Sequence, residues 1–73
     1  MKELHELLDL CLAKELIFNL SPDFKLVKVY QIIDDEYTFN KSAYYGGELE
    51  GYTDNYTTTL ENLIKKVKGY ESK

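Results

Sequence analysis

The first part of the chain carries apolar residues at steps of three and four. They are Leu4, Leu7, Leu8, Cys11 and Leu12. Because an α-helix completes a turn in about 3.6 residues, this spacing gathers them on one face. The pattern predicts an amphipathic helix over residues 2–14. We expect Cys11 to be a small buried residue within this apolar face.

The period of the pattern changes after this segment. Leu16, Phe18 and Leu20 come at steps of two, which is the period of a β-strand. The sequence therefore predicts a short strand over residues 16–20. A first helix that continues to residue 19 is the alternative. Pro22 then predicts a turn, because proline fixes φ and has no N–H to donate to a neighbouring strand.

The middle of the chain is predicted to form further strands. Residues 25–33 and 36–45 are rich in β-branched and aromatic residues, and a shorter strand is expected over residues 48–53. Asp34-Asp35 and Gly46-Gly47 separate these segments as tight turns. Strands joined by such turns are antiparallel, so we expect an antiparallel meander.

A two-residue loop at Asp34-Asp35 also fixes which residues of the two strands face each other. With this loop Ile32 pairs with Tyr37, and Tyr30 pairs with Phe39. This register builds one apolar face. We therefore expect Tyr30 and Tyr37 to lie in the core.

The same register has one unfavourable consequence. It places Lys28 directly beside Lys41. Like charges in facing positions destabilise a sheet. We expect a β-bulge or a fraying strand end at this point.

The last segment has a clear helical pattern. Leu60, Leu63, Ile64 and Val67 follow the i, i+3, i+4, i+7 rule, which predicts a helix over residues 58–68. Thr58 and Glu61 have the spacing of a capping box. Gly69 is expected to terminate the helix.

These elements define the expected fold class. We predict a single α+β domain over residues 1–73, with an N-terminal helix, a three- or four-stranded antiparallel meander and a C-terminal helix. Each helix has one apolar face that must be buried. The simplest arrangement packs both helices on one face of the sheet.

The composition excludes several classes of function. In 73 residues there are 9 basic and 13 acidic residues, so the net charge is −4, and every basic residue is a lysine. An acidic chain without arginine is a poor nucleic-acid binder. No stretch reaches the ~20 apolar residues of a membrane span. No apolar signal segment follows Met1, and a single cysteine cannot form an internal disulfide, so we expect a cytoplasmic protein.

The reactive side chains do not form a recognisable site. His5 is the only histidine and has no partner at metal-ligand spacing. Asp34-Asp35-Glu36 lacks the ligand spacing of a calcium-binding loop, and Gly46-Gly47 is not followed by a phosphate-loop sequence. We therefore expect no catalytic residue, no metal and no cofactor.

Acidic residues and tyrosines gather in the same part of the chain. Residues 34–61 contain seven acids and a single lysine, and Tyr44, Tyr45, Tyr52 and Tyr56 lie in the same stretch. Tyr44 and Tyr45 are adjacent on a predicted strand, so they point to opposite faces and one of them must leave the core face. Tyrosine is enriched at binding surfaces. The residues expected to bind another protein are Asp34, Asp35, Glu36, Tyr44, Tyr45, Glu48, Glu50, Tyr52, Asp54 and Tyr56.

In size, acidity and element order, the chain resembles the small helix–meander–helix inhibitors that phages encode, including some anti-CRISPR proteins. The resemblance is one of class and shares no diagnostic motif. The stretch from Gly51-Tyr52-Thr53 to Leu63 is also similar to the strand-to-helix junction of HicB-type antitoxins. The chain departs from these antitoxins in its leading helix and in lacking a DNA-binding tail.

Together these observations predict a non-catalytic inhibitor that binds a basic surface of a protein, with no direct binding to nucleic acid or to a membrane. The resemblance to phage inhibitors implies a nucleic-acid-handling host or defence protein as the target, an acidic surface acting as a DNA mimic, and the host cytoplasm as the location. The alternative is a self-associating accessory or regulatory subunit, antitoxin-like, with the tyrosine face buried in a homodimer.

Overall fold

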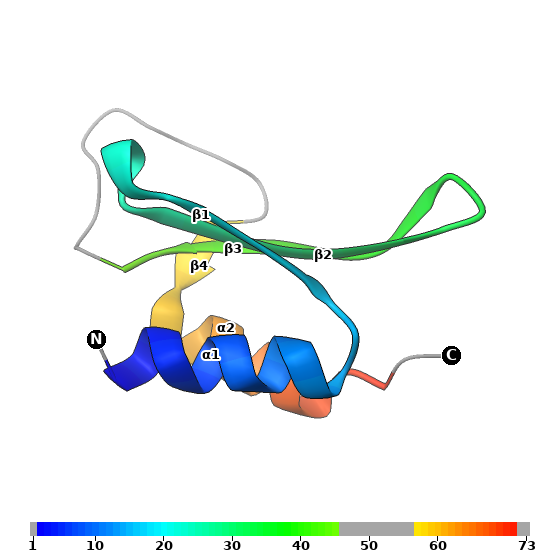
Figure 1. Ribbon diagram of the computed structural model, residues 1–73, viewed down its shortest axis with the longest axis horizontal. Coiled ribbons are helices and arrows are strands. Elements are labelled where there is room, and N and C mark those ends of the chain that lie inside the picture. Colours follow the sequence, from blue (N-terminus) through cyan, green and yellow to red (C-terminus); the bar gives the residue numbers. More distant parts are fainter. Residues whose placement is uncertain (1, 46–56, 72–73) are drawn as a thin grey trace.

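The computed structural model describes residues 2–45 and 57–71 and shows two helices packed against one face of a four-stranded sheet (Figure 1). The predicted α+β fold, with both helices on the same face, is confirmed. In chain order the elements are α1 (Lys2–Ala13), β1 (Ile17–Ser21), the short 3-10 helix η1 (Pro22–Phe24), β2 (Leu26–Ile33), β3 (Glu36–Tyr44), β4 (Thr57–Thr59) and α2 (Leu60–Gly69).

Helix α1 ends where its chain takes up a left-handed conformation. Glu15 has φ 58°, and the N–H of Leu16 donates to the carbonyl of Cys11 at 2.9 Å. This is the hydrogen bond that closes many helix C-termini. Leu16 and Cys11 are both buried, so the turn also packs against the core. The predicted strand is present, shifted by one residue from 16–20 to Ile17–Ser21, and the alternative of a longer helix is wrong.

The sheet has the strand order β1-β2-β3-β4. The pairs β1–β2 and β2–β3 are antiparallel as predicted, but β4 runs parallel to β3. The expectation of a wholly antiparallel meander is therefore wrong at its last strand. The strand predicted over residues 48–53 lies outside the described residues.

Both ends of α2 differ by a residue or two from the prediction. Residues 57–59 form β4, so the helix begins at Leu60 and Thr59 is its N-cap, with the Thr59 side chain accepting from the backbone N–H of Asn62 at 3.2 Å. The predicted capping box at Thr58 is therefore wrong. Gly69 is the last helical residue and not the terminating residue beyond it.

The core lies between the sheet and the two helices. Val27, Val29 and Ala43 of the sheet are fully buried against residues of both helices. The helical members of this core are Leu7 and Cys11 of α1 and Leu60, Leu63, Ile64 and Val67 of α2. The prediction that Cys11 is a buried apolar residue is confirmed. Leu12, which the helical pattern also assigned to the apolar face, is 69% exposed.

One lysine joins the two helices at their C-terminal ends. The ammonium group of Lys14, just after α1, donates to the carbonyls of Lys68 at 3.0 Å and Tyr70 at 2.5 Å. A cation here satisfies carbonyls that have no partner within the helix and opposes the negative end of its dipole. The contact fixes the end of α2 beside the end of α1.

Candidate protein-binding surface

The β2–β3 hairpin places three acids at one end of the molecule. Asp34 and Asp35 form the two-residue loop and have φ 53° and 66°. Positive φ at both central residues is typical of the type I′ turn, which matches the twist of a hairpin. Asp tolerates this conformation better than most residues. The predicted turn is confirmed, and Asp34, Asp35 and Glu36 are exposed at its tip.

A β-bulge next to this turn changes the pairing of β2 with β3. The pairing of Ile32 with Tyr37 is as predicted, but the register shifts between Gln31 and Ile32, so Tyr30 pairs with Asn40 and not with Phe39. The extra residue increases the local twist of the strand. The expected bulge exists, at a position closer to the turn than predicted.

The shifted register removes the unfavourable lysine pair. Lys28 now pairs with Ser42, and Lys41 pairs with Val29. Because facing residues share a face and adjacent residues alternate, the two ammonium groups leave from opposite faces of the sheet. The bulge thus separates the like charges that a regular hairpin would bring together.

Tyr30 and Tyr37 lie on the open face of the sheet, the face turned away from the helices. Tyr37 is 63% exposed and Ile32 is 45% exposed, while Tyr30 is half-buried. The rings of Tyr30 and Tyr37 meet edge to face, with centroids 6.1 Å apart. The prediction that both tyrosines belong to the core is wrong. The reason is that strand periodicity separates two faces of a sheet without telling which face the helices will cover.

These side chains and the neighbouring acids form one surface, here called the hairpin patch. Its members are Tyr30, Ile32, Asp34, Asp35, Glu36 and Tyr37. In Figure 1 the hairpin that carries them extends beyond the helices. The patch therefore combines exposed aromatic and aliphatic area with a cluster of negative charge at a projecting end.

The base of the hairpin is held by the residue that follows α2. The hydroxyl of Tyr70 donates to the side-chain oxygen of Gln31 and lies 3.3 Å from the hydroxyl of Thr38. The ring of Tyr70 packs on Phe39 with centroids 4.7 Å apart. This contact on the helix side fixes the hairpin where the helices end, so that the opposite side can remain exposed and still be ordered.

The other described residues of the predicted binding set lie at the far end of β3. Tyr44 and Tyr45 are about 25 Å along the strand from Glu36, at about 3.3 Å per residue. As predicted, they point to opposite faces: Tyr45 packs against the core, and Tyr44 pairs with buried Leu26 on the open face. The hairpin acids and these two tyrosines are therefore not one surface. Glu48, Glu50, Tyr52, Asp54 and Tyr56 lie outside the described residues.

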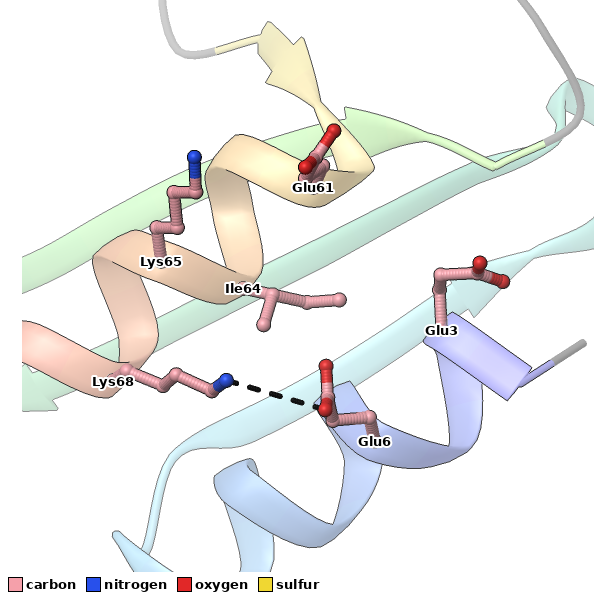
Figure 2. Close-up of a pocket in the computed structure, with 6 residues that line it drawn as sticks. All are labelled: Glu3, Glu6, Glu61, Ile64, Lys65 and Lys68. Atoms are coloured by element: carbon pink, nitrogen blue, oxygen red, sulfur yellow. Dashed lines mark ion pairs between the residues drawn. The ribbon is translucent and has the colours of Figure 1, made fainter.

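A shallow groove separates α1 from α2 on the side away from the sheet. It has a volume of about 440 Å³ and is lined by acids, lysines and one aliphatic side chain (Figure 2). Its lining residues are Glu3, Glu6, Glu61, Ile64, Lys65 and Lys68. Lys68 and Glu6 approach to 4.0 Å, and both are more than half exposed. Ion pairs of this kind contribute little free energy, so the groove is a solvated helix–helix boundary.

The candidate reactive groups do not assemble into a site. Burial raises the pKa of the Cys11 thiol from 9.0 to about 11, which opposes formation of the nucleophilic thiolate. His5 is exposed on α1. Within residues 2–45 and 57–71, no group of three or more His, Cys, Asp and Glu side chains could hold a metal ion.

Comparison with protein-family models, curated proteins and solved structures found no match for this chain. Neither described helix has the length and apolar character that crossing a membrane requires. A proposal for the function of the protein therefore rests on the physical properties of the described surface.

Proposed function

We propose that this protein is a non-catalytic inhibitor that binds a basic surface of another protein through the hairpin patch. The observation that carries the proposal is the combination of Tyr37 at 63% exposure and Ile32 at 45% exposure with three exposed acids on a projecting hairpin. Exposed apolar area next to a rim of charge is the usual composition of a protein-binding surface.

The chemistry of the patch defines its partner. Tyr37 and Ile32 favour an apolar or aromatic contact at the centre, since burying them removes apolar area from water. Asp34, Asp35 and Glu36 favour lysine and arginine around that contact. A surface with apolar groups among basic residues is common on proteins that handle nucleic acids. Occupying such a surface would block its nucleic acid.

The acids and tyrosines between residues 48 and 56 remain part of the proposal as additional contacts. The charge in residues 34–61 is strongly negative, and a field of this extent attracts a basic partner before contact. The hairpin patch alone is sufficient for a direct test.

The test compares three forms of the intact chain as bait in a lysate of the cells in which the protein acts. They are the wild type, a hairpin variant with Asp34→Asn, Asp35→Asn and Glu36→Gln, and a groove variant with Glu3→Gln, Glu6→Gln and Glu61→Gln. Both variants lose the same charge. Asparagine also accepts positive φ, so the hairpin turn is retained. Bound proteins are quantified by mass spectrometry and then titrated individually.

We expect a basic protein that the wild type and the groove variant capture and the hairpin variant does not. Removing three favourable rim charges should weaken the purified complex roughly tenfold. Tyr37→Ser should weaken it further without changing net charge. Equal capture by all three forms would contradict the proposal, as would a partner whose affinity follows the groove acids.

A further inference from the structure

Strand β1 lies at an edge of the sheet that the described residues form. Among the described residues it pairs with β2 alone. Its residues Ile17–Ser21 include no charged side chain and no proline. Monomeric proteins usually place charged residues or proline on an edge strand, because the unpaired N–H and C=O groups of that strand otherwise bind another strand.

The helix beneath β1 extends this uncharged edge. Helix α1 packs under β1, and α2 packs under β3 and β4. Glu6 lies on the side of α1 that meets α2. One-turn steps place Leu4, Leu8 and Leu12 along a different side, away from that contact. Leu12 is 69% exposed.

In the part of the chain that the structure describes, three of the five exposed large apolar residues are found here. They are Leu12 on α1 and Ile17 and Leu20 on β1, with Ile17 and Leu20 at 45% and 44% exposure. Ile17 and Leu20 point to opposite faces of β1, since their positions differ by an odd number. The strand edge with these residues and Leu8 is called the β1 flank below. It presents backbone hydrogen-bonding groups between two rows of apolar side chains.

We propose that the β1 flank binds a second copy of this chain, with the two β1 strands paired antiparallel about a two-fold axis near Asn19. The two sheets then form one continuous sheet, and the two α1 helices lie next to each other beneath it. A two-fold interface uses the same patch on both partners. An uncharged strand with apolar residues on both sides matches a copy of itself in hydrogen bonding, polarity and length.

The area that a stable dimer interface must bury indicates that the two α1 helices take part in the contact. A stable protein interface buries about 1,200 Å² or more in total, which is more than a pair of five-residue strands supplies alone. Exposed Leu12 and half-buried Leu8 provide the remaining apolar contact. A dimer through this flank therefore requires strand and helix to act together.

The distribution of charge also favours a second copy. The acidic turn Asp34-Asp35 lies at one end of the sheet. The two-fold axis sends the acidic turns of the two copies to opposite ends, so their like charges are kept apart. Both hairpin patches stay accessible in this dimer. The inference is thus independent of the proposed function, and either can fail without the other.

Sedimentation velocity of the intact chain over a wide concentration series tests the dimer. We expect the wild type to pass from monomer to dimer as concentration rises. Leu12→Glu and Leu20→Lys should each raise the dimer dissociation constant roughly tenfold or more, because a charge is placed in the centre of an apolar contact. Asn62→Glu on exposed α2 makes the same charge change as Leu12→Glu and should leave the constant unchanged.

Hydrogen exchange locates the contact. Amides of Ile17–Ser21 should exchange more slowly at high protein concentration, and amides of the hairpin turn should not change. Circular dichroism checks that each variant is folded, which is expected for Leu12→Glu at a position 69% exposed. A wild type that remains monomeric at every concentration overturns the proposal. A dimer that dissociates in the Tyr37→Ser variant but persists in the Leu12→Glu variant also overturns the proposal.

Discussion

Cys11 illustrates how far a single residue can be interpreted from its position in a pattern. Its place within the apolar repeat of α1 predicted a buried side chain, and the structure leaves it with no exposed surface. Burial removes the water that would stabilise a thiolate and raises the pKa of the thiol to about 11. The residue therefore contributes packing and not reactivity.

This burial predicts a pH dependence of stability. In the unfolded chain the thiol has its ordinary pKa of 9.0, whereas in the folded chain its pKa is about 11. The neutral buried thiol therefore stabilises the fold fully below pH 9.0, and this contribution is lost as the pH rises towards 11. The full loss should be about 3 kcal/mol, at 1.36 kcal/mol per pKa unit, of which about 2 kcal/mol is lost by pH 11.

Urea unfolding of the wild type and of Cys11→Ala measures this contribution. All other ionisable side chains are the same in both proteins, so the difference between their free energies of unfolding isolates Cys11. The advantage of the wild type should be constant below pH 9.0 and should decrease by about 2 kcal/mol up to pH 11. Parallel curves for the two proteins would show that the thiol stays neutral in both states.

Tyr30 and Tyr37 show where residue-level prediction ends. Alternation along the strand correctly separates them from Val27 and Val29, but both faces of this hairpin carry apolar residues. Only the packing of the helices decides which face is buried. The helices cover Val27 and Val29, and the more aromatic row remains exposed.

At the scale of the element, the hairpin turn is held in a conformation that its residues adopt at a cost. Asp35 has φ 66°, and the left-handed region costs a residue with a Cβ about 1–2 kcal/mol. Glycine has no such cost, although its unfolded chain is more flexible. Asp35→Gly should therefore stabilise the protein by about 0.5 kcal/mol, or roughly 3 °C in Tm.

Asp35→Ala is the charge-matched control for this substitution. Alanine keeps the Cβ and lacks the local hydrogen bonding that helps aspartate in turns. It should be less stable than the wild type, and about 1 kcal/mol less stable than the glycine variant. Thermal unfolding of the three proteins measures the order. An alanine variant as stable as the glycine variant would mean that the turn relaxes to another type.

The boundary between β4 and α2 shows how tertiary pairing overrides a local signal. Three consecutive threonines precede the helix, and each can act as an N-cap. The sequence favoured Thr58 as the N-cap because Glu61 follows it at capping-box spacing, yet residues 57–59 pair with β3. Because the pairing of Thr59 with Tyr44 keeps Thr59 in extended backbone, Thr59 cannot be the first helical residue after a cap at Thr58, and Thr59 is itself the cap. The existence of the helix was predictable, whereas its first residue depended on a distant strand.

At the scale of the whole molecule, the layered arrangement followed from two amphipathic helices and a set of alternating strands. The parallel direction of β4 did not, because it depends on the path of the chain between Tyr45 and Thr57. The acids at the tip of the hairpin were found from the sequence alone. The exposure of their neighbours Ile32 and Tyr37 was missed, because the alternation along the strands does not tell which face of the hairpin the helices cover.

The two chemical parts of the hairpin patch should act on different steps of binding. In the proposed complex, Asp34, Asp35 and Glu36 should act over a distance and accelerate the encounter with a basic partner. Tyr37 and Ile32 act only after contact, when water is removed, and so determine the lifetime of the complex. We therefore expect the charge-neutralised hairpin to show mainly a lower association rate, and Tyr37→Ser mainly a higher dissociation rate.

Surface plasmon resonance with the captured partner, repeated at increasing ionic strength, separates the two effects. The wild-type association rate should fall with salt, because the Debye length shortens from about 10 Å at 0.1 M to 3 Å at 1 M. The neutralised variant should lose much of this salt dependence, and Tyr37→Ser should keep it. If neutralisation changed only the dissociation rate, the acids would be buried in the contact itself. In that case the patch would bind through specific ion pairs and not by attraction over a distance.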